Sequence, residues 1–549
     1  VAMHLDLATT DLSDLQGEVC VIGAGPAGIT AARRLLELGR HVTLIESGGT
    51  DYEDETSDLN AGESVGQPYY RLEHARLRFF GGTAAIWGGR VAELDPIDFE
   101  PRSWVPYSGW PIRYEALQPY YRTAWSMLGL EPPHRESEPL GKRVTLPRFD
   151  EERISLRYWG FDSHSDRFGF GSCADLRNNP NCLIVTHATV AEIVTRPDGS
   201  AVEMVMVRTP DGREVRVRAR AFVLAAGGIE NARLLLASNR HAPAGVGNGH
   251  GLVGRFFMEH PHTRGGRLVA SATWGLIKAF GRSHRVGRQR VAALVTAARQ
   301  QQERLGILNS SLTLAPRQPE GSRPFAAMRL YNKAKHDLAP RHLTRAAWRR
   351  AKSLVTSAQM VIDPLRPWLM HRLGLLDLAL LVRAEQAPNP DSRVTLSQDR
   401  DPLGTPRVRL DWKMTELDKN SVAGLVALFG SECERLGLGR VEPAPWLTDE
   451  SEPWHTDPLI SAHPIGGYHH MGTTRMADSA RHGVTDGFGN VFGVHNLYVA
   501  GSSLFTTSGW ANPTLTLMAL ALRTSERISA RLDEPEASAG PQLKVVSNL

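Results

Sequence analysis

Two short apolar runs near the start of the chain enclose a glycine-rich turn and a helical pattern. The first run covers residues 19–22 and ends directly at Gly23, which is typical of a buried strand in a parallel sheet. From residue 29 to residue 36 the apolar side chains recur at helical spacing on one face, and Gly39 closes this pattern. Residues 41–46 form the second apolar run. The order predicts a strand–turn–helix–strand unit.

The rest of the chain alternates strand-like and helical patterns. Residues 183–225 contain short apolar runs separated by turns of the Pro-Asp-Gly type, which predict β structure. Residues 391–412 predict two further strands around a turn. Helices are expected at residues 230–238 and from Pro513 to about residue 531. The polar composition of residues 534–549 predicts a disordered tail.

The first turn, Gly23-Ala24-Gly25-Pro26-Ala27-Gly28, has the spacing of a dinucleotide-binding loop. In such a loop Gly23 permits the tight turn, Gly25 lets the backbone approach a pyrophosphate, and Gly28 lets the helix pack closely on the strand. The helix N-terminus offers N–H groups and positive potential to the phosphates. Glu46 ends the second strand, where a carboxylate accepts hydrogen bonds from the ribose hydroxyls. Glycine turns also occur without a ligand, but this context favours a bound nucleotide, either NAD or FAD.

The length of 549 residues exceeds what one compact core can support, so two or three domains are expected. Nucleotide-binding patterns occur at the start, the middle and the end of the chain, which indicates one nucleotide domain assembled from separate segments. The intervening sequence then forms a second, substrate-binding domain. We place the nucleotide domain in residues 15–95, 183–265 and 460–533, and the substrate-binding domain in residues 96–182 and 266–459.

Residues 331–383 are expected to form a helical segment within the second domain. The stretch is basic and amphipathic, and it ends in a mostly apolar run from Leu375 to Leu381. As hypotheses, it covers the entrance of the active site or forms a contact in a homo-oligomer. A helix on a membrane surface is the less favoured alternative, because a solvated helix face is the commoner origin of such a pattern.

Composition excludes several classes of partner. The formal net charge is only +4, so nucleic acid is not an implied partner. The four cysteines include no C-x-x-C pair, so neither a disulfide framework nor a metal site is predicted, and a reducing compartment is expected. No secretion signal and no run of roughly 18 apolar residues is found, so a cytoplasmic protein without a membrane span is expected.

Five stretches in a fixed order carry a family resemblance: the N-terminal turn, the glycine-rich loop 81–89, residues 225–228, residues 253–261, and the block 469–523. Together they resemble the glucose–methanol–choline family of FAD-dependent oxidoreductases, over most of the chain. The resemblance implies an α/β fold, with a Rossmann-like FAD-binding domain built on a parallel sheet with a β-meander. It also implies an α+β substrate-binding domain with an antiparallel sheet.

The resemblance makes FAD the expected cofactor, and Ile86 makes its binding noncovalent. In some pyranose oxidases a histidine at the matching position carries a covalent link to the flavin, which isoleucine cannot form. Val190 is expected to contact the adenine through its main chain, and Gly501 and Ser502 to contact the ribityl chain and phosphates. The full set of expected FAD contacts is Gly23, Gly25, Pro26, Ala27, Gly28, Glu46, Gly82, Thr83, Trp87, Val190, Gly501, Ser502, Asn512, Pro513 and Thr514.

The same resemblance assigns catalysis to His469 and Asn512. It implies that His469 takes the proton of the substrate hydroxyl while the carbinol C–H delivers hydride to flavin N5, and that Asn512 holds the same oxygen. An unperturbed histidine titrates near pH 6.5, which suits a general base. The alternatives are a buried structural histidine at 469 and a simple helix start at Asn512-Pro513. His470 is a weaker candidate near the substrate, and His260 and His463 receive no role.

Residues 95–99, 104–112 and 385–390 resemble the carbohydrate-oxidising members of the family, such as pyranose and glycoside oxidases. The expected reaction is therefore oxidation of a CH–OH group of a sugar or glycoside to a carbonyl. Trp510 is the tryptophan expected to stack on the sugar ring, although core packing explains a lone tryptophan as well. The alternatives are oxidation of a primary alcohol of an aminoglycoside precursor, a lyase of the same fold with a redox-idle flavin, and NAD-linked oxidation. The electron acceptor is left open between oxygen and another small molecule.

Overall fold

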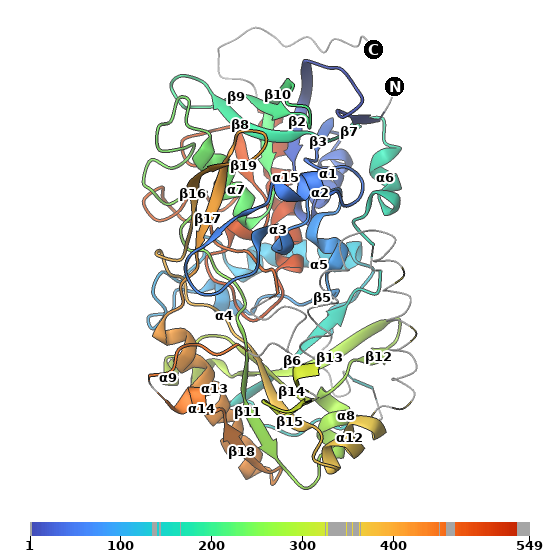
Figure 1. Ribbon diagram of the computed structural model, residues 1–549, viewed down its shortest axis with the longest axis vertical. Coiled ribbons are helices and arrows are strands. Elements are labelled where there is room, and N and C mark those ends of the chain that lie inside the picture. Colours follow the sequence, from blue (N-terminus) through green and yellow to red (C-terminus); the bar gives the residue numbers. More distant parts are fainter. Residues whose placement is uncertain are drawn as a thin grey trace.

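The computed structural model describes residues 3–133, 140–141, 144–164, 166–323, 325–327, 347, 354, 362, 364–449, 451–456 and 467–534. Within this part of the chain, two eight-stranded sheets lie toward opposite ends of the long axis (Figure 1). The two largest buried apolar clusters follow the same division, one around each sheet. No helix in these ranges is long and apolar enough to cross a bilayer.

The first sheet has the predicted parallel core and β-meander. β2 and β3 are parallel, and the apolar run Val19–Ile22 of β2 is entirely buried, as a continuous apolar strand requires. β9 lies between β8 and β10 and runs antiparallel to both, and β19 pairs with β10, so strands far apart in the sequence share one sheet. The strands, in sheet order, are β1 (His4–Asp6), β7 (Cys182–Thr186), β3 (Val42–Ile45), β2 (Asp14–Ile22), β10 (Glu214–Leu224), β9 (Val202–Arg208) and β8 (Thr189–Thr195), with β19 (Leu497–Val499) beside β10.

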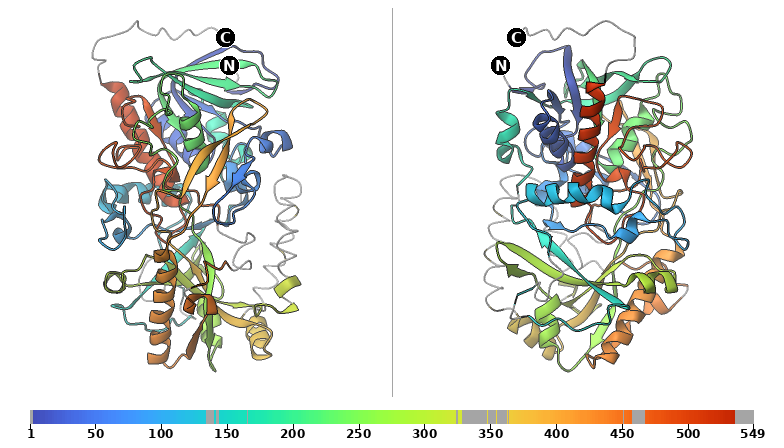
Figure 2. Two further views of the ribbon diagram at one scale, coloured as in Figure 1. Left: turned by 60° about the vertical axis from the view of Figure 1, so that its left-hand side comes forward. Right: turned by 180° about the vertical axis from the view of Figure 1, so that it is seen from behind.

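The first helix, α1 (Pro26–Glu37), begins directly at the glycine turn. Gly23 has a φ of 103°, which favours glycine, and Gly25 caps the helix without any side-chain hydrogen bond. The amide groups of the first turn therefore remain available to a ligand. The C-terminal helix α15 (Thr514–Asp533) packs against α1 and against α5 (Tyr114–Met127), as Figure 2 shows with α15 in red and α5 in cyan.

The second sheet is antiparallel throughout, as predicted for the substrate-binding part. Helices α8 (Trp274–Phe280) and α13 (Glu416–Arg435) contribute side chains to its buried cluster. Its strands, in sheet order, are β18 (Arg440–Pro443), β11 (His262–Val269), β15 (Asp377–Arg383), β14 (Ser311–Arg317), β13 (Gln289–Ala297), β6 (Ile154–Phe161) and β5 (Arg90–Val91), with β12 (His284–Val286) beside β13.

The expected helical segment 331–383 needs correction at its end. The apolar run of this segment enters the strand β15, which lies between β11 and β14, whereas α12 (Leu365–Arg372), just before it, is a helix. A short continuous run of apolar residues is compatible with a buried central strand and with a buried helix. Such a run shows neither the alternation of a half-buried strand nor the spacing of an amphipathic helix. Most of residues 328–363, and the predicted tail from residue 535 onward, lie outside the described residues.

The hairpin β16 (Arg393–Arg400) and β17 (Pro406–Asp411) confirms the two strands expected at residues 391–412. It forms a three-stranded sheet with β4 (Gly62–Ser64) and contacts α7 (Gly228–Ala237), beside the first large sheet (Figure 1). This hairpin therefore packs with the predicted nucleotide domain, although the predicted boundaries assign it to the substrate-binding domain. The boundaries elsewhere stay predictions.

Candidate functional site

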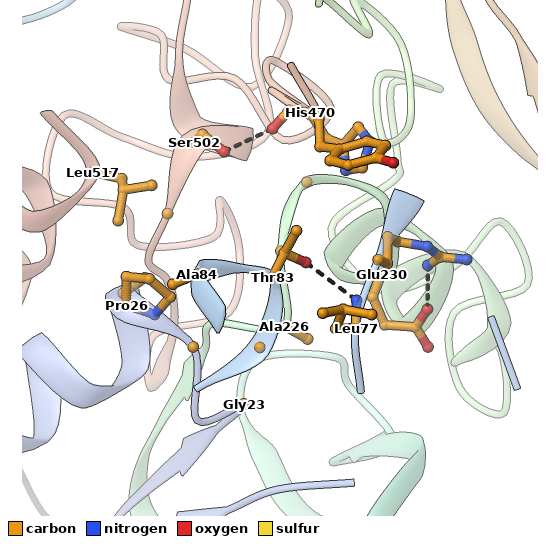
Figure 3. A pocket seen from close by; sticks show the side chains of 18 of the residues that line it. Gly23, Pro26, Leu77, Thr83, Ala84, Ala226, Glu230, His470, Ser502 and Leu517 are labelled. Atoms are coloured by element: carbon orange, nitrogen blue, oxygen red, sulfur yellow. Dashed lines mark hydrogen bonds and ion pairs between the residues drawn. The ribbon is translucent and has the colours of Figure 1, made fainter. Parts of the chain in front are cut away.

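A cavity of about 480 Å³ lies where the glycine turn, the loop before β5, the second sheet and the start of α15 meet. Its volume falls within the usual range of small-molecule sites. Figure 3 shows Gly23 and Pro26 of the turn facing it from one side and Ser502 and His470 from another. The predicted site residues that line it are Gly23, Gly25, Pro26, Ala27, Glu46, Gly82, Thr83, Trp87, Val190, His469, His470, Gly501, Ser502, Asn512, Pro513 and Thr514.

Two predicted site residues do not line the cavity. Gly28 packs against the turn, where an added Cβ would lie 1.9 Å from the carbonyl oxygen of Gly23, so it serves the predicted close helix–strand packing. Trp510 is only 3% exposed, and its Nε1 donates a hydrogen bond of 2.8 Å to Asp95. The expectation that Trp510 stacks on a sugar is therefore corrected: the indole is a core side chain held by a buried carboxylate.

The end of the cavity near the glycine turn fits a dinucleotide. An added Cβ on Gly25 would meet no protein atom within 4 Å, so this backbone faces open space. Glu46 is buried at the same wall, and its two carboxylate oxygens accept the N–H groups of Ala24 (2.9 Å) and Gly48 (3.0 Å). Each oxygen keeps a lone pair for a ribose hydroxyl.

An ion-pair cluster that was not predicted completes this wall. The guanidinium groups of Arg76 and Arg78 lie 2.9 and 3.1 Å from the carboxylate of Glu230, and Arg78 also donates to Ser47. Figure 3 shows Glu230 and the neighbouring Leu77 facing the cavity. Arginines scattered along the sequence carry no spacing that marks such a cluster, because the contacts are made across the fold.

The predicted catalytic residues lie side by side. The ring nitrogen Nε2 of His469 is 3.2 Å from the side-chain amide nitrogen of Asn512, and both residues line the cavity. Asn512 directly precedes Pro513 and the first turn of α15, so a helix start and a cavity position coincide here.

His260, which the sequence gave no role, fixes the tautomer of His469. Its Nε2 lies 2.8 Å from the carbonyl oxygen of Gly509, so Nε2 carries the proton and donates it. Burial lowers the pKa of His260 to about 4, which leaves its Nδ1 as an acceptor at neutral pH. This Nδ1 is 2.8 Å from Nδ1 of His469 and accepts a hydrogen bond from it. The lone pair of His469 is therefore on Nε2, next to Asn512.

A buried carboxylate holds the backbone of both histidines. Glu259 is fully buried, and its Oε1 accepts the N–H groups of His260 (3.0 Å) and His469 (2.8 Å). Its Oε2 accepts a hydrogen bond of 2.6 Å from the hydroxyl of Tyr69, which in turn accepts one from His470 Nε2. His470 therefore takes part in the hydrogen-bond chain that runs through Tyr69 to Glu259. Glu259, Tyr69 and His260 are residues of the site that the sequence did not predict.

The electrostatic surroundings keep His469 neutral. Burial lowers its pKa well below the ordinary value, and the nearby His260, His470, Arg383 and Arg90 lower it further. A general base must be unprotonated to act, so a neutral imidazole at neutral pH suits that role.

Comparison with known proteins identifies two parts of the chain. The family model described as GMC oxidoreductase matches residues 388–521, and the model described as FAD dependent oxidoreductase matches residues 18–246. The chain is 27% identical to paromamine 6'-oxidase of Streptomyces fradiae over 581 residues, covering 96% of this chain and 94% of the relative. It is 24% identical to 2-methyl-1,2-propanediol dehydrogenase of Mycolicibacterium austroafricanum over 600 residues, covering 94% and 96%.

The fold also matches solved structures. A crystal structure of formate oxidase superposes with a TM-score of 0.53 at 18% identity, over 95% of this chain and 99% of the other. The predicted α/β fold, family and FAD cofactor are thereby confirmed. The chain is an FAD-dependent oxidoreductase that acts on the CH–OH groups of alcohols, and its C-terminal part matches the family of GMC (glucose–methanol–choline) oxidoreductases.

Proposed function

We propose that this enzyme oxidises a CH–OH group of a carbohydrate or glycoside to a carbonyl, with His469 as the general base. The observation that carries the proposal is the His469–Asn512 pair at the cavity wall, with His260 holding the His469 lone pair on Nε2. The FAD contacts expected at the glycine turn, the glycine-rich loop and the start of α15 belong to the same proposal, as does noncovalent binding beside Ile86.

The chain's own residues divide the chemistry between them. FAD, when bound, supplies the acceptor for the hydride that leaves the carbinol carbon. His469 Nε2 takes the hydroxyl proton, and the side-chain amide of Asn512 donates a hydrogen bond to the same oxygen and orients it. Glu259 and His260 keep the imidazole in place through the backbone and through Nδ1. Because these supports are buried, the base needs little rearrangement as the substrate enters.

A polyhydroxylated substrate is favoured by one of the relatives. Paromamine 6'-oxidase is named for a substrate that carries several hydroxyl groups, and it matches nearly the whole chain. A primary alcohol of an aminoglycoside precursor is the alternative within the same reaction class. A lyase with a redox-idle flavin would use the fold without net oxidation, and no contact between described residues of the site favours it.

Anaerobic mixing of the yellow holoenzyme with a panel of sugars, glycosides and simple diols tests the proposal. We expect sugars or glycosides to bleach the flavin absorbance and to yield a carbonyl product. Bleaching by simple diols alone would reject the carbohydrate assignment. Turnover of a substrate with a persistently yellow enzyme would reject oxidation in favour of the lyase.

Replacing His260 by Leu is expected to slow flavin reduction by about tenfold or more, within the range that a positioned base provides. The variant removes the acceptor for His469 Nδ1–H, so the imidazole is free to place its proton on Nε2 instead. His260→Asn, whose side-chain oxygen is able to accept the same hydrogen bond, should restore part of the rate. Stopped-flow reduction rates across pH, together with flavin content, check both variants. Equal losses in the two variants would show that His260 is needed for packing and not for the tautomer.

A further inference from the structure

The wall of the cavity formed by the second sheet carries positive charge. Arg90 of β5, His262 of β11 and Arg383 of β15 all line the cavity that His469 and Asn512 line. His262 and Arg383 are register partners on neighbouring antiparallel strands, so their side chains share one face of the sheet. They are 4% and 6% exposed, so both are at least nine-tenths buried.

The two arginines have no carboxylate partner among the described residues. Their contacts there are with aromatic rings: Arg90 lies 5.4 Å from the ring centre of Trp159 and Arg383 lies 5.0 Å from the same ring. Polar atoms beside them also lack hydrogen-bond partners, namely Nε of Arg90, Nε1 of Trp159 and both ring nitrogens of His262. Buried polar groups without partners are rare in native proteins, and a cluster of them indicates a missing ligand.

Three other buried arginines of the chain are paired with carboxylates. Arg102 donates to Glu385, Arg76 to Glu230, and Arg233 to Asp401, each at 2.7 to 2.9 Å. Arg475 is also buried without a carboxylate, but its guanidinium donates a hydrogen bond to the carbonyl oxygen of Tyr107. Arg90 and Arg383 make neither kind of contact among the described residues, and they line the cavity that the proposed catalytic base also lines.

The electrostatics agree with a missing anion. Burial and the nearby Arg317 lower the pKa of Arg90 to about 10, and burial with Arg90 and Arg317 lowers the pKa of Arg383 well below its usual value. Among the described residues, no acidic side chain acts on either group to offset this effect. A guanidinium stays protonated in proteins, so the unfavourable charge calls for an anion from outside the chain.

We propose that Arg90, Arg383 and His262 form an oxyanion-binding subsite, so that the alcohol oxidised by this enzyme carries a carboxylate or phosphate group. Guanidinium groups bind such oxyanions through paired, charge-assisted hydrogen bonds, and the two ring nitrogens of His262, which have no protein partner, lie on the same wall. The substrate class becomes a sugar acid or a sugar phosphate instead of a neutral sugar. This inference rests on the proposed function, because it names the substrate of the same site.

The first test measures anion binding without turnover. The holoenzyme is titrated with sodium acetate and with sodium phosphate, against sodium chloride at equal ionic strength, while the flavin spectrum is followed. We expect a saturable spectral change with acetate or phosphate, and a dissociation constant at least about tenfold higher in Arg383→Gln and Arg90→Gln, the loss expected for one charged hydrogen bond. Arg267→Gln is the matched control, because Arg267 lies on β11, is exposed and pairs with Glu442.

The second test compares matched sugars: glucose, glucuronate and glucose 6-phosphate. Their dissociation constants are measured from the flavin spectrum, whether or not the flavin is reduced. We expect the better of the two anions to bind at least about tenfold more tightly than glucose, and Arg383→Gln to remove that difference while glucose binding changes by less than about threefold. A preference for glucuronate identifies the carboxylate as the ligand, and a preference for glucose 6-phosphate identifies the phosphate.

Two results would overturn the subsite. The first is equal binding of neutral and anionic sugars by the wild-type enzyme. The second is an Arg383→Gln variant that shifts the reduction potential of the flavin and weakens all sugars alike, which would mean that the arginines act on the cofactor. In either case bleaching by neutral sugars would leave the proposed function intact. Anion binding by an enzyme that no alcohol reduces would support the subsite and reject the proposed function.

Discussion

Replacement of His469 by Ala is expected to slow anaerobic reduction of the flavin by substrate by about 10²–10⁴-fold, the usual contribution of a positioned general base. The variant should remain yellow, because the dinucleotide end of the cavity is formed by other residues, among them Gly25 and Glu46. The rate falls because the variant lacks the His469 Nε2 lone pair, which lies beside Asn512 and is proposed to take the hydroxyl proton. Stopped-flow absorbance at the visible flavin maximum measures the rate directly.

His482→Ala is the matched control, because this histidine is exposed and lies in the same C-terminal block. It should reduce at the wild-type rate. In the wild-type enzyme the rate should stay level as pH falls from 8 to 6.5 and decline only in more acid solution. The rate is expected to stay level because the pKa of His469 lies well below 6.5. The imidazole becomes protonated, and so stops acting as a base, only when the pH falls below that pKa. If the His469→Ala variant retained the wild-type reduction rate, the proposal that His469 is the general base would be wrong.

Replacement of Gly28 by Ala is expected to abolish FAD binding and to destabilise the first domain. The added Cβ would lie 1.9 Å from the carbonyl oxygen of Gly23, far inside contact distance, so α1 would have to separate from the turn. Gly25→Ala provides the comparison. Gly25 has a φ of −84° and open space on its Cβ side, so alanine fits the protein itself. Its methyl group instead enters the space proposed for the pyrophosphate.

The two glycine variants therefore separate folding from cofactor binding. For Gly25→Ala we expect an unchanged melting temperature of the apoprotein and a dissociation constant for FAD at least about tenfold higher, which corresponds to about 1.4 kcal/mol. For Gly28→Ala we expect a lower apoprotein melting temperature and a colourless preparation. Equal flavin content in both variants and the wild type would exclude the turn as the dinucleotide site.

The parts of the fold that could be predicted are those whose signal is local. The strand, turn and helix of residues 19–46 follow from periodicity and glycine spacing within one short stretch, and the structure has all of them, although β2 begins at Asp14, before its apolar run. The same holds for α15, whose start is marked by Asn512-Pro513. The segment ending in β15 was misassigned because its apolar run has no period that separates a buried strand from a helix.

The parts of the site that could not be predicted are contacts between distant residues. His260 and His469 are 209 positions apart, and they meet because Met258 and Met471 form a β-bridge that brings their segments together. No spacing in the sequence reports such a bridge. Arg383 and His262 likewise become neighbours only through strand register. Trp510 was assigned to the substrate from its closeness to Asn512 in sequence, whereas its side chain turns into the core.

The hydrogen bond between the two histidines also restricts the route by which a proton can leave after catalysis. The far nitrogen of His260 already holds a hydrogen that points at the carbonyl oxygen of Gly509, and a carbonyl cannot pass a proton onward. Protonating His260 fully is unfavourable, since burial lowers its pKa to about 4. Under the proposed function, a proton taken up by His469 therefore has to leave by way of the cavity. We then expect the electron acceptor to take up the proton together with the electrons, which a rapid-kinetic comparison of oxygen with one-electron acceptors would test.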